Sequence, residues 1–398
     1  MNREDFSMLR NTDIIYFDNN ATTLKPDCVV KEITDYYTKY TANAHRGDYK
    51  TSHKVDTLYE DTRDVVKNYI NAGDSKEIVF TYGSTDSINL VTESFFKNKL
   101  QKGDEVIITK TEHASIVLPF MKLAKEIGIK LIYAPLDDDF NLTIDGLKSV
   151  INPKTKAIAL AHVTNTIGDI RDLDKIGSLC TENGIYFLVD AAQSIGHKKI
   201  DVRKSNIDFL AFSGHKMLGP TGVGVLYGKY DYLKEMEPTR VGGGMNTFFE
   251  EDSYEYKLPP HKFEAGTPNI EGVIGLRRAI LYINEIGLDQ IAKHEEDLKE
   301  YLIEKLKRLD NINVINPNSQ SGNILFNIEG IFPQDTAVYL DHYNICVRAG
   351  NHCAKLLKDE LGTKNTCRIS LYLYNTKEEI DKLIEVLENS KNIFEVVI

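Results

Sequence analysis

Residues 209–224 read Phe-Leu-Ala-Phe-Ser-Gly-His-Lys-Met-Leu-Gly-Pro-Thr-Gly-Val-Gly, and the architecture can be worked out from this stretch. The apolar run 209–212 predicts a buried strand that leads directly into Ser213, His215 and Lys216. A lysine there lies at the carboxyl end of a strand, where open α/β sheets bind ligands. Desolvation suits such a lysine to a Schiff base. For a lysine considered alone, a surface position after a strand is the commoner situation.

Apolar runs alternate with helical segments on either side of this stretch, from about residue 60 to residue 230. Short, continuous apolar strands separated by helices predict an α/β domain, whose sheet is mostly parallel and has helices on both faces. The expected strands are 78–82, 105–109, 130–134, 157–163, 185–190, 209–212 and 223–227. The expected helices include 84–97 and 116–127.

The pattern changes after residue 228. The acidic, proline-containing segment 250–261 predicts an excursion from the core, and 272–286 predicts a linking helix. Beyond it we expect helices at 289–309, 333–343 and 377–389, and strands at 313–315, 323–327, 346–348 and 367–373. We therefore predict a large domain of residues 15–281 and a smaller α+β domain of residues 282–398, which residues 1–14 join.

Composition excludes several classes of protein. The chain has 398 residues, and its 48 basic and 59 acidic residues give a net charge of −11, which argues against nucleic-acid or anionic-membrane binding. It contains no run of 18 apolar residues and starts with charged residues, so we expect a cytoplasmic protein without a membrane segment. The five cysteines do not have the spacing of a disulfide scaffold. A metal site at Cys346, His352 and Cys353 would lack a paired Cys-x-x-Cys motif, so we expect no metal.

Asp190 ends a second apolar run, Ile-Tyr-Phe-Leu-Val-Asp at 185–190. An enzyme that uses pyridoxal phosphate needs a carboxylate against the pyridinium nitrogen, to keep the ring an electron sink. Gln193 would then lie within reach of the ring hydroxyl. Taken alone, Asp190 is equally well explained as a turn residue or a helix cap.

Two further motifs follow predicted strands. A predicted helix begins at Gly83, Ser84 and Thr85. Backbone amides at a helix N-terminus can hold a phosphate, and an ordinary N-cap is the alternative explanation. His113 follows the next strand, where a flat imidazole could stack on a cofactor ring. A histidine in such a place is more often structural.

Cys353 lies among polar residues, after Gly350, Asn351 and His352. A loop thiol near a cationic group can be partly ionised and attack sulfur. The other cysteines have apolar or strand-like neighbours and are expected to be buried and inert; they are Cys28, Cys180, Cys346 and Cys367. Arg368 lies on a predicted strand, where its guanidinium could bind an amino-acid carboxylate or form an internal ion pair.

These segments resemble the class-V, fold-type I family of pyridoxal-phosphate enzymes, and further motifs narrow the resemblance to cysteine desulfurases. The resemblance extends from Tyr16 to Thr376. Its motifs include Asn43-Ala-His-Arg-Gly, His162-Val-Thr-Asn, Gly242-Gly-Gly, Phe263-Glu-Ala-Gly-Thr-Pro-Asn, Arg348-Ala-Gly-Asn-His-Cys and Cys367-Arg-Ile-Ser. The compact Arg-x-Gly-x-His-Cys loop resembles the second subgroup, which supplies sulfur for iron–sulfur cluster assembly. Asn351 replaces a histidine that is frequent in the family, and Ser84 and Asp86 replace Thr and Glu.

The resemblance implies a large domain with a mostly parallel seven-stranded sheet flanked by helices, and a smaller C-terminal domain that carries the cysteine loop. It implies pyridoxal 5′-phosphate as cofactor, with Lys216, His113 and Cys353 catalytic. The implied cofactor-binding residues are Lys216, Asp190, Gln193, His113, Ser84, Thr85, Ser213, His215 and Thr267, the last reaching across a homodimer. The implied substrate-binding residues are Arg368, Asn165 and His45.

The implied activity converts L-cysteine to L-alanine and leaves a persulfide on Cys353, which a sulfur-acceptor or scaffold protein then receives. Two alternatives stay open at this point. One is a selenocysteine lyase or another class-V enzyme. The other is a non-catalytic scaffold protein of the same fold.

Overall fold

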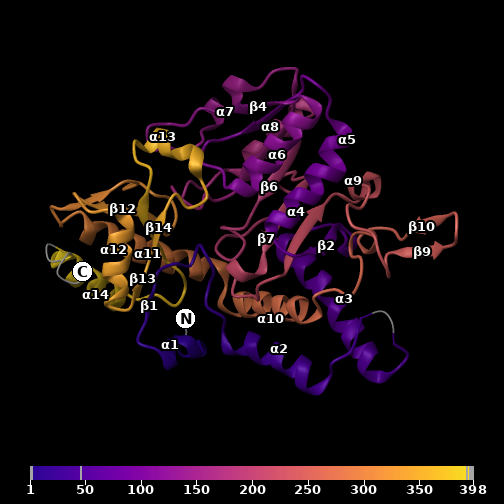
Figure 1. The fold of residues 1–398 in the computed structure, drawn as a ribbon, viewed down its shortest axis with the longest axis horizontal. Helices are drawn as coiled ribbons and strands as arrows, with labels where there is room; N and C mark the ends of the chain where they lie inside the picture. The colour runs from indigo at the N-terminus through magenta and orange to yellow at the C-terminus, as the bar shows by residue number, and fades with distance from the viewer. Residues whose placement is uncertain (1–2, 45–46, 391–392, 394–398) are drawn as a thin grey trace.

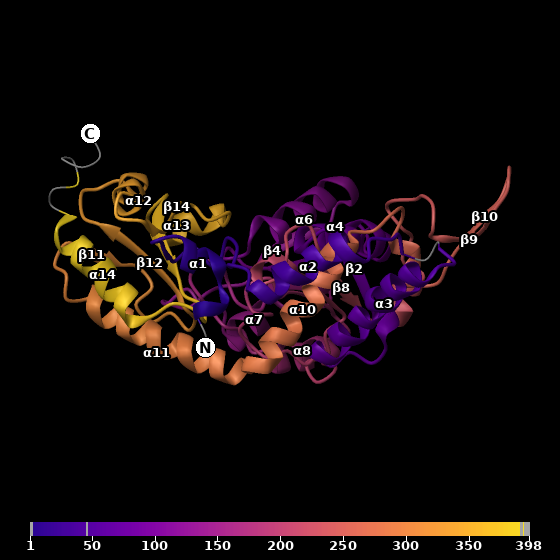
Figure 2. The ribbon, with the colours of Figure 1, turned by 90° about the horizontal axis from the view of Figure 1, so that it is seen from below.

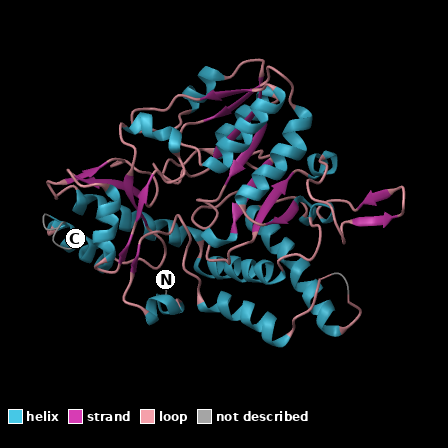
Figure 3. Cartoon of the chain, in the orientation of Figure 1, coloured by secondary structure: helices cyan, strands magenta, loops and turns pink. Residues whose placement is uncertain are grey.

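The larger part of the chain is built around a seven-stranded sheet (Figure 1, Figure 3). The computed structural model describes residues 3–44, 47–390 and 393. The strands lie in the order β2-β8-β7-β6-β5-β3-β4, and β8 runs antiparallel to both of its neighbours. Their bounds are β2 Ile78–Thr81, β3 Glu105–Ile108, β4 Lys130–Tyr133, β5 Thr155–Ala161, β6 Tyr186–Asp190, β7 Phe209–Ser213 and β8 Gly224–Gly228. The predicted mostly parallel, seven-stranded sheet is confirmed.

Helices cover both faces of this sheet because its central strands are apolar on both sides. Along β7, Leu210 and Phe212 pack into one core while Phe209 and Ala211 pack into the other. The first core includes α2 (Asp27–Lys39), α3 (Lys50–Ile70), α7 (Ile144–Val150), α8 (Leu173–Asn183) and α10 (Ile270–Ile286). The second includes α4 (Ser84–Val91), the π-helical turn Thr92–Phe96, α6 (Ala114–Ile127) and α9 (Tyr230–Glu235). The predicted helix 84–97 therefore contains a π-turn and continues into α5 (Lys97–Lys99).

The C-terminal part holds an antiparallel sheet in the order β11-β12-β15-β14. Its elements are α11 (Leu288–Leu306), β11 (Ile312–Val314), β12 (Asn323–Ile328), α12 (Pro333–Asp341), β14 (Arg348–Gly350), α13 (Lys358–Leu361), β15 (Thr366–Ser370) and α14 (Lys377–Glu388). The predicted strand 367–373 is too long at its end, because the Asn375 side chain accepts a hydrogen bond from the Tyr372 N–H and turns the chain. The predicted strand 346–348 is two strands, β14 and β13 (Ile345–Cys346).

The N-terminal residues contact both parts of the molecule (Figure 2). The segment contains α1 (Ser7–Asn11) and β1 (Ile15–Tyr16), and β1 pairs in parallel with β13. Arg3 forms an ion pair with Glu379, and Phe6 packs against Tyr282 and Tyr374. The domain boundary at residues 281 and 282 stays a prediction.

A hairpin of β9 (Asn246–Phe249) and β10 (Tyr254–Tyr256) projects away from the body (Figure 1, Figure 2). It contains most of the predicted excursion, but the strands themselves were not predicted. Phe249 and Tyr254, which pair across the hairpin, are exposed, so no core contact marks this segment as a strand. None of the described helices is long and apolar enough to cross a membrane.

Candidate active site

A cavity of about 240 Å³ opens where the large sheet meets β14 and β15. The carboxyl ends of the parallel strands β5, β6 and β7 reach this place, since parallel strands end at the same edge of a sheet. The predicted site residues on its wall are Ser84, Thr85, His113, Asn165, Asp190, Gln193, Ser213, His215, Lys216, Cys353 and Arg368. Residues from seven separate segments thus meet at one place.

Lys216 and Asp190 come from neighbouring strands. Lys216 ends the short helix Gly214–Lys216 directly after β7, and Asp190 is the last residue of β6. Burial lowers the pKa of Lys216 from 10.5 to about 8, against the opposing effect of the Asp190 carboxylate. Asp190 Oδ1 accepts hydrogen bonds from Ser84 Oγ (2.8 Å) and from the Ala192 N–H (2.9 Å). The carboxylate is therefore held in place, and the amine is shifted toward its neutral, nucleophilic form.

The N-terminus of α4 forms the polar end of the cavity. The Ser84 N–H donates to Ser213 Oγ (2.8 Å), and the Thr85 and Ser115 hydroxyls lie 2.6 Å apart. Gly224 on β8 packs so closely that a Cβ there would lie 2.4 Å from Gly83 Cα. Hydroxyl groups and backbone amides at a helix N-terminus are suited to a phosphate group.

His113 caps the N-terminus of α6. Its Nδ1 accepts a hydrogen bond from the Ser115 N–H (3.1 Å), which places the ring proton on Nε2. Burial lowers the pKa of His113, and the Lys216 ammonium lowers it further. Burial and Lys216 also lower the pKa of His215, to about 4. Both imidazoles are therefore neutral near pH 7.

Arg368 faces Arg348 across the β14–β15 ladder, and Asp18 lies between the two guanidinium groups. Each arginine is 3.2 Å from an Asp18 oxygen, and Arg368 also donates to the Asn165 carbonyl (2.9 Å). Burial lowers the pKa of Arg368 to about 10. Within the described chain, Arg368 Nε and Asn165 Oδ1 are buried without a hydrogen-bond partner. Arg368 thus forms the internal ion pair with Asp18. A donor on Arg368 and an acceptor on Asn165 remain unused by the described residues at the cavity.

Arg348 also lines the cavity, although it was not predicted as a site residue. It is the first residue of the cysteine-loop motif, but only the strand register places it opposite Arg368. Asn20 was missed in the same way. It lines the cavity, and its carbonyl accepts a hydrogen bond from Gln193 (3.0 Å).

Cys353 is exposed on a loop at the mouth of the cavity. His352 and Cys353 both have left-handed backbone conformations, with φ of 50° and 58°. The His352 carbonyl accepts from Asn165 Nδ2 (2.6 Å), and the Cys353 carbonyl accepts from the Ala114 N–H (2.9 Å). Burial and Arg368 lower the pKa of His352 to about 3, so its imidazole is neutral near pH 7. The cationic groups that interact with the Cys353 thiol are therefore Lys216 and Arg368.

The other cysteines differ in burial. Cys180 and Cys367 are buried, as expected, and burial raises the pKa of each thiol. Cys28 and Cys346 are half-buried, so the expectation that they are buried holds only in part. Burial raises the pKa of both of them as well.

One predicted site residue among those that the structure describes, Thr267, does not line this cavity. Thr267 is exposed, and its hydroxyl lies 3.5 Å from Asn43 Nδ2. His45 lies outside the described residues. Among the residues that the structure describes, no group of His, Cys, Asp and Glu side chains is arranged to hold a metal ion.

Comparison with known proteins agrees with this geometry. The family profile described as aminotransferase class-V matches residues 15–383. The chain belongs to the class-V aminotransferase family. A probable cysteine desulfurase from Halalkalibacterium halodurans is 43% identical over 386 residues, covering 97% of this chain and 95% of the relative. Within the class-V family, the chain belongs to the cysteine desulfurases.

Two solved structures of cysteine desulfurases have the same fold. The apo structure of the enzyme from Thermococcus onnurineus NA1 is 39% identical, with a TM-score of 0.93 and coverage of 97% and 96% of the two chains. The Escherichia coli enzyme CsdA, in an S-sulfonic acid form, is 34% identical, with a TM-score of 0.91 and coverage of 100% and 98%. Together with the family match, they confirm the predicted fold class.

The cavity of this class-V enzyme fits pyridoxal 5′-phosphate. A lysine of lowered pKa, a fixed carboxylate and a helix N-terminus with hydroxyl groups match the aldehyde, ring nitrogen and phosphate of that cofactor. Neutral His113 supplies a flat ring on the same wall.

Proposed function

We propose that this cysteine desulfurase removes sulfur from L-cysteine and carries it as a persulfide on Cys353. One observation carries the proposal: the exposed Cys353 thiol is on the wall of the same cavity as Lys216. The overall reaction takes L-cysteine and the Cys353 thiol to L-alanine and the Cys353 persulfide. Atoms balance without a further reactant.

The proposed site residues divide into three groups by role. Lys216 holds the cofactor and takes the α-proton of the substrate. Asp190 binds the nitrogen of the cofactor ring and Gln193 binds its oxygen. His113 stacks on the ring. Ser84, Thr85, Ser213 and His215 hold the phosphate, with Thr267 from a second subunit. Arg368 and Asn165, with His45, bind the substrate. When bound, pyridoxal phosphate supplies an electron sink for the charge left at the α-carbon.

Cys353 performs the sulfur step. Its thiolate attacks the substrate sulfur, a sulfur–sulfur bond forms, and the carbon–sulfur electron pair stays with the three-carbon fragment, which a proton converts to alanine. The loop then moves so that an acceptor or scaffold protein can take the sulfur. We propose iron–sulfur cluster assembly as the use of this sulfur, a cytoplasmic location, and a homodimer as the working form.

Replacing Cys353 tests the sulfur step. Cys353→Ser should retain the cofactor, with its visible absorption, and should form no protein persulfide after cysteine is added, because a hydroxyl cannot hold the transferred sulfur. Mass spectrometry of the unaltered protein should find one extra sulfur on Cys353. An extra sulfur on Cys346 or Cys367 instead would contradict the proposal.

The two alternative functions have separate tests. A selenocysteine lyase would form alanine from selenocysteine and hardly any from cysteine. A non-catalytic scaffold would lack the visible absorption of bound cofactor and would form no alanine from either substrate. A cysteine desulfurase should form alanine from cysteine, faster when a thiol reductant removes the persulfide.

A further inference from the structure

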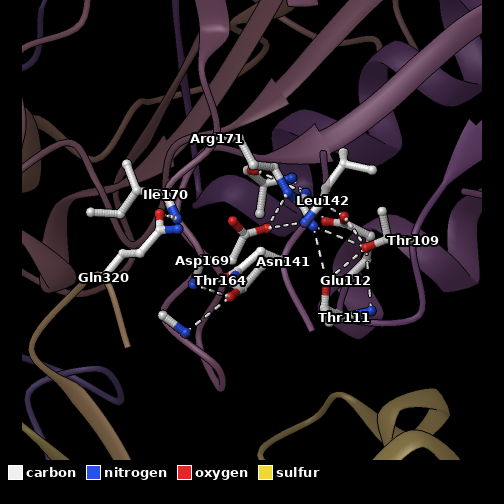
Figure 4. Close-up of polar contacts among 12 residues, drawn as sticks. Thr109, Thr111, Glu112, Asn141, Leu142, Thr164, Asp169, Ile170, Arg171 and Gln320 are labelled. Atoms are coloured by element: carbon white, nitrogen blue, oxygen red, sulfur yellow. Dashed lines mark hydrogen bonds and ion pairs between the residues drawn. The ribbon is translucent and has the colours of Figure 1, made fainter. Parts of the chain in front are cut away.

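Glu112 and Arg171 form a buried ion pair (Figure 4). Neither residue lines the cavity, but both bind Ala161, which does. Both side chains are fully buried, and Arg171 Nη1 lies 2.5 Å from Glu112 Oε1. Glu112 directly precedes His113, and Arg171 lies in the loop 162–172 between β5 and α8, which also contains Asn165. The pair therefore joins two loops that both supply residues to the active site.

The Arg171 guanidinium uses every one of its N–H groups. Nε donates to Asp169 (3.1 Å), Nη1 donates to Glu112 and to the Ala161 carbonyl (3.0 Å), and Nη2 donates to the hydroxyls of Thr109 and Thr111 (2.9 Å each). Figure 4 shows these contacts converging on one side chain. A lysine ammonium carries the same charge but cannot span these partners, because its donors share a single nitrogen.

The Glu112–Arg171 ion pair lies beside the end of β5, where β5 has no neighbouring residue on β3. Strand β3 ends at Ile108, whereas β5 continues to Ala161, so the last residue of β5 has no β3 partner. Glu112 Oε2 accepts from the Ala161 N–H (2.8 Å), and Arg171 donates to the Ala161 carbonyl. Two side chains thus complete the hydrogen bonds of a residue that itself lines the cavity.

Each of the two joined loops, or the helix that directly follows it, also holds one carbonyl of the Cys353 loop. Beyond His113, the Ala114 N–H donates to the Cys353 carbonyl (2.9 Å), and on the other side Asn165 Nδ2 donates to the His352 carbonyl (2.6 Å). The second loop is closed on itself, because Asp169 and Thr164 exchange hydrogen bonds (3.0 and 3.1 Å). The separation of these two donors therefore depends on how the loops are tied.

We propose that Glu112 and Arg171 form a positioning pair for the Cys353 loop, since they tie together the two segments whose donors hold its consecutive carbonyls. The pair touches neither substrate nor cofactor. Loosening it should free the loop locally and slow sulfur transfer to Cys353, while the cofactor stays bound. The sulfur-transfer part of this inference rests on the proposed function, and the loop-positioning part does not.

Hydrogen exchange of the holoenzyme without cysteine tests loop positioning directly. In Arg171→Lys, the charge remains and the spanning contacts are lost, so we expect roughly tenfold faster exchange of the Ala114 amide, the effect of losing about one hydrogen bond. Glu112→Gln is the second variant. A glutamine side chain has only one acceptor oxygen, so it can accept from either Arg171 or the Ala161 N–H but not from both.

Arg63→Lys is the matched control. Arg63 is also buried and also binds a carboxylate, that of Glu264, through two nitrogens, yet these residues belong to a different part of the fold. Its variant should lower the melting temperature and leave exchange of the Ala114 amide unchanged. The inference is overturned if both test variants fold with unchanged Ala114 exchange, or if the control accelerates that exchange equally.

A single-turnover experiment measures the consequence for chemistry. After cysteine is added, Arg171→Lys should form the Cys353 persulfide roughly tenfold more slowly than the unaltered protein, with the same cofactor content. Equal rates, despite faster Ala114 exchange, would overturn the link to sulfur transfer. If the unaltered protein forms no persulfide at all, the proposed function is wrong. The Ala114 exchange rates then still decide whether Glu112 and Arg171 position the loop.

Discussion

Lys216 shows how a single residue acquires its chemistry from burial. Its pKa is lowered to about 8, so the amine is charged below that pH and neutral above it. Only the neutral amine can attack the cofactor aldehyde. The rate at which cofactor-free protein captures pyridoxal phosphate should therefore rise with pH up to about 8 and then level off. Absorption of the bound cofactor measures this rate.

Lys216→Ala is the control for this pH dependence. It should remove the covalent capture at every pH, while the circular dichroism of the folded protein is unchanged. A capture rate that keeps rising to the ordinary lysine pKa of 10.5 would show that burial does not shift this amine.

Arg368 combines an internal ion pair with unused hydrogen-bonding capacity at the cavity. Loss of one partner of a desolvated charge pair costs roughly 2–5 kcal/mol. Arg368→Ala should therefore raise the cysteine concentration needed for half-maximal activity by well over tenfold, with cofactor absorption unchanged. Steady-state kinetics measure this. An unchanged requirement for cysteine would mean that Arg368 serves only the ion pair with Asp18.

At the level of elements, β8 packs against the start of α4 through two glycines. A Cβ on Gly224 would lie 2.4 Å from Gly83 Cα, and both partners are backbone that cannot rotate away. Gly224→Ala should displace α4 and lower the free energy of unfolding by about 1–3 kcal/mol. It should also weaken binding of the cofactor's phosphate group. Thermal unfolding and cofactor retention after dialysis measure the two effects.

Gly73→Ala is the matched control for this packing. A Cβ there would meet only the flexible Glu77 side chain, at 3.4 Å, and φ lies outside the left-handed region. It should leave both stability and cofactor retention nearly unchanged. If Gly224→Ala behaves like this control, the close approach of β8 does not constrain α4.

At the level of the whole molecule, Thr267 lies outside the cavity of its own chain, and its segment is anchored by Glu264, which pairs with Arg63. If the protein is a two-fold dimer, each subunit can supply Thr267 to the other. Thr267→Asp should disable the site that it enters, because its charge opposes the phosphate. Mixed dimers of Thr267→Asp with Lys216→Ala should regain activity, since one of their two sites is intact.

Isolated mixed dimers distinguish the two arrangements. If Thr267 acts within its own subunit, each site of the mixed dimer carries one damaging substitution and activity stays absent. Folded, dimeric and inactive mixed dimers would therefore reject the shared site. The activity of co-expressed, separately tagged subunits is the measurement.

The sequence by itself determined the features that depend on local pattern. Apolar runs predicted every strand of the large sheet, because strands of a sheet that helices cover on both faces are short and mostly apolar. Groups at or shortly after the carboxyl ends of those strands, such as Asp190, Lys216 and His113, could be predicted too, since parallel strands end at one edge of a sheet.

Only the tertiary structure decided which distant segments meet. Arg348 faces Arg368 through strand register, and Asn165 reaches the Cys353 loop across 187 residues of chain. Glu112 and Arg171 have no local pattern that joins them, since their contact depends on where β3 ends beside β5. Such long-range contacts follow from packing and hydrogen-bond satisfaction over the whole fold, which periodicity along the chain does not encode.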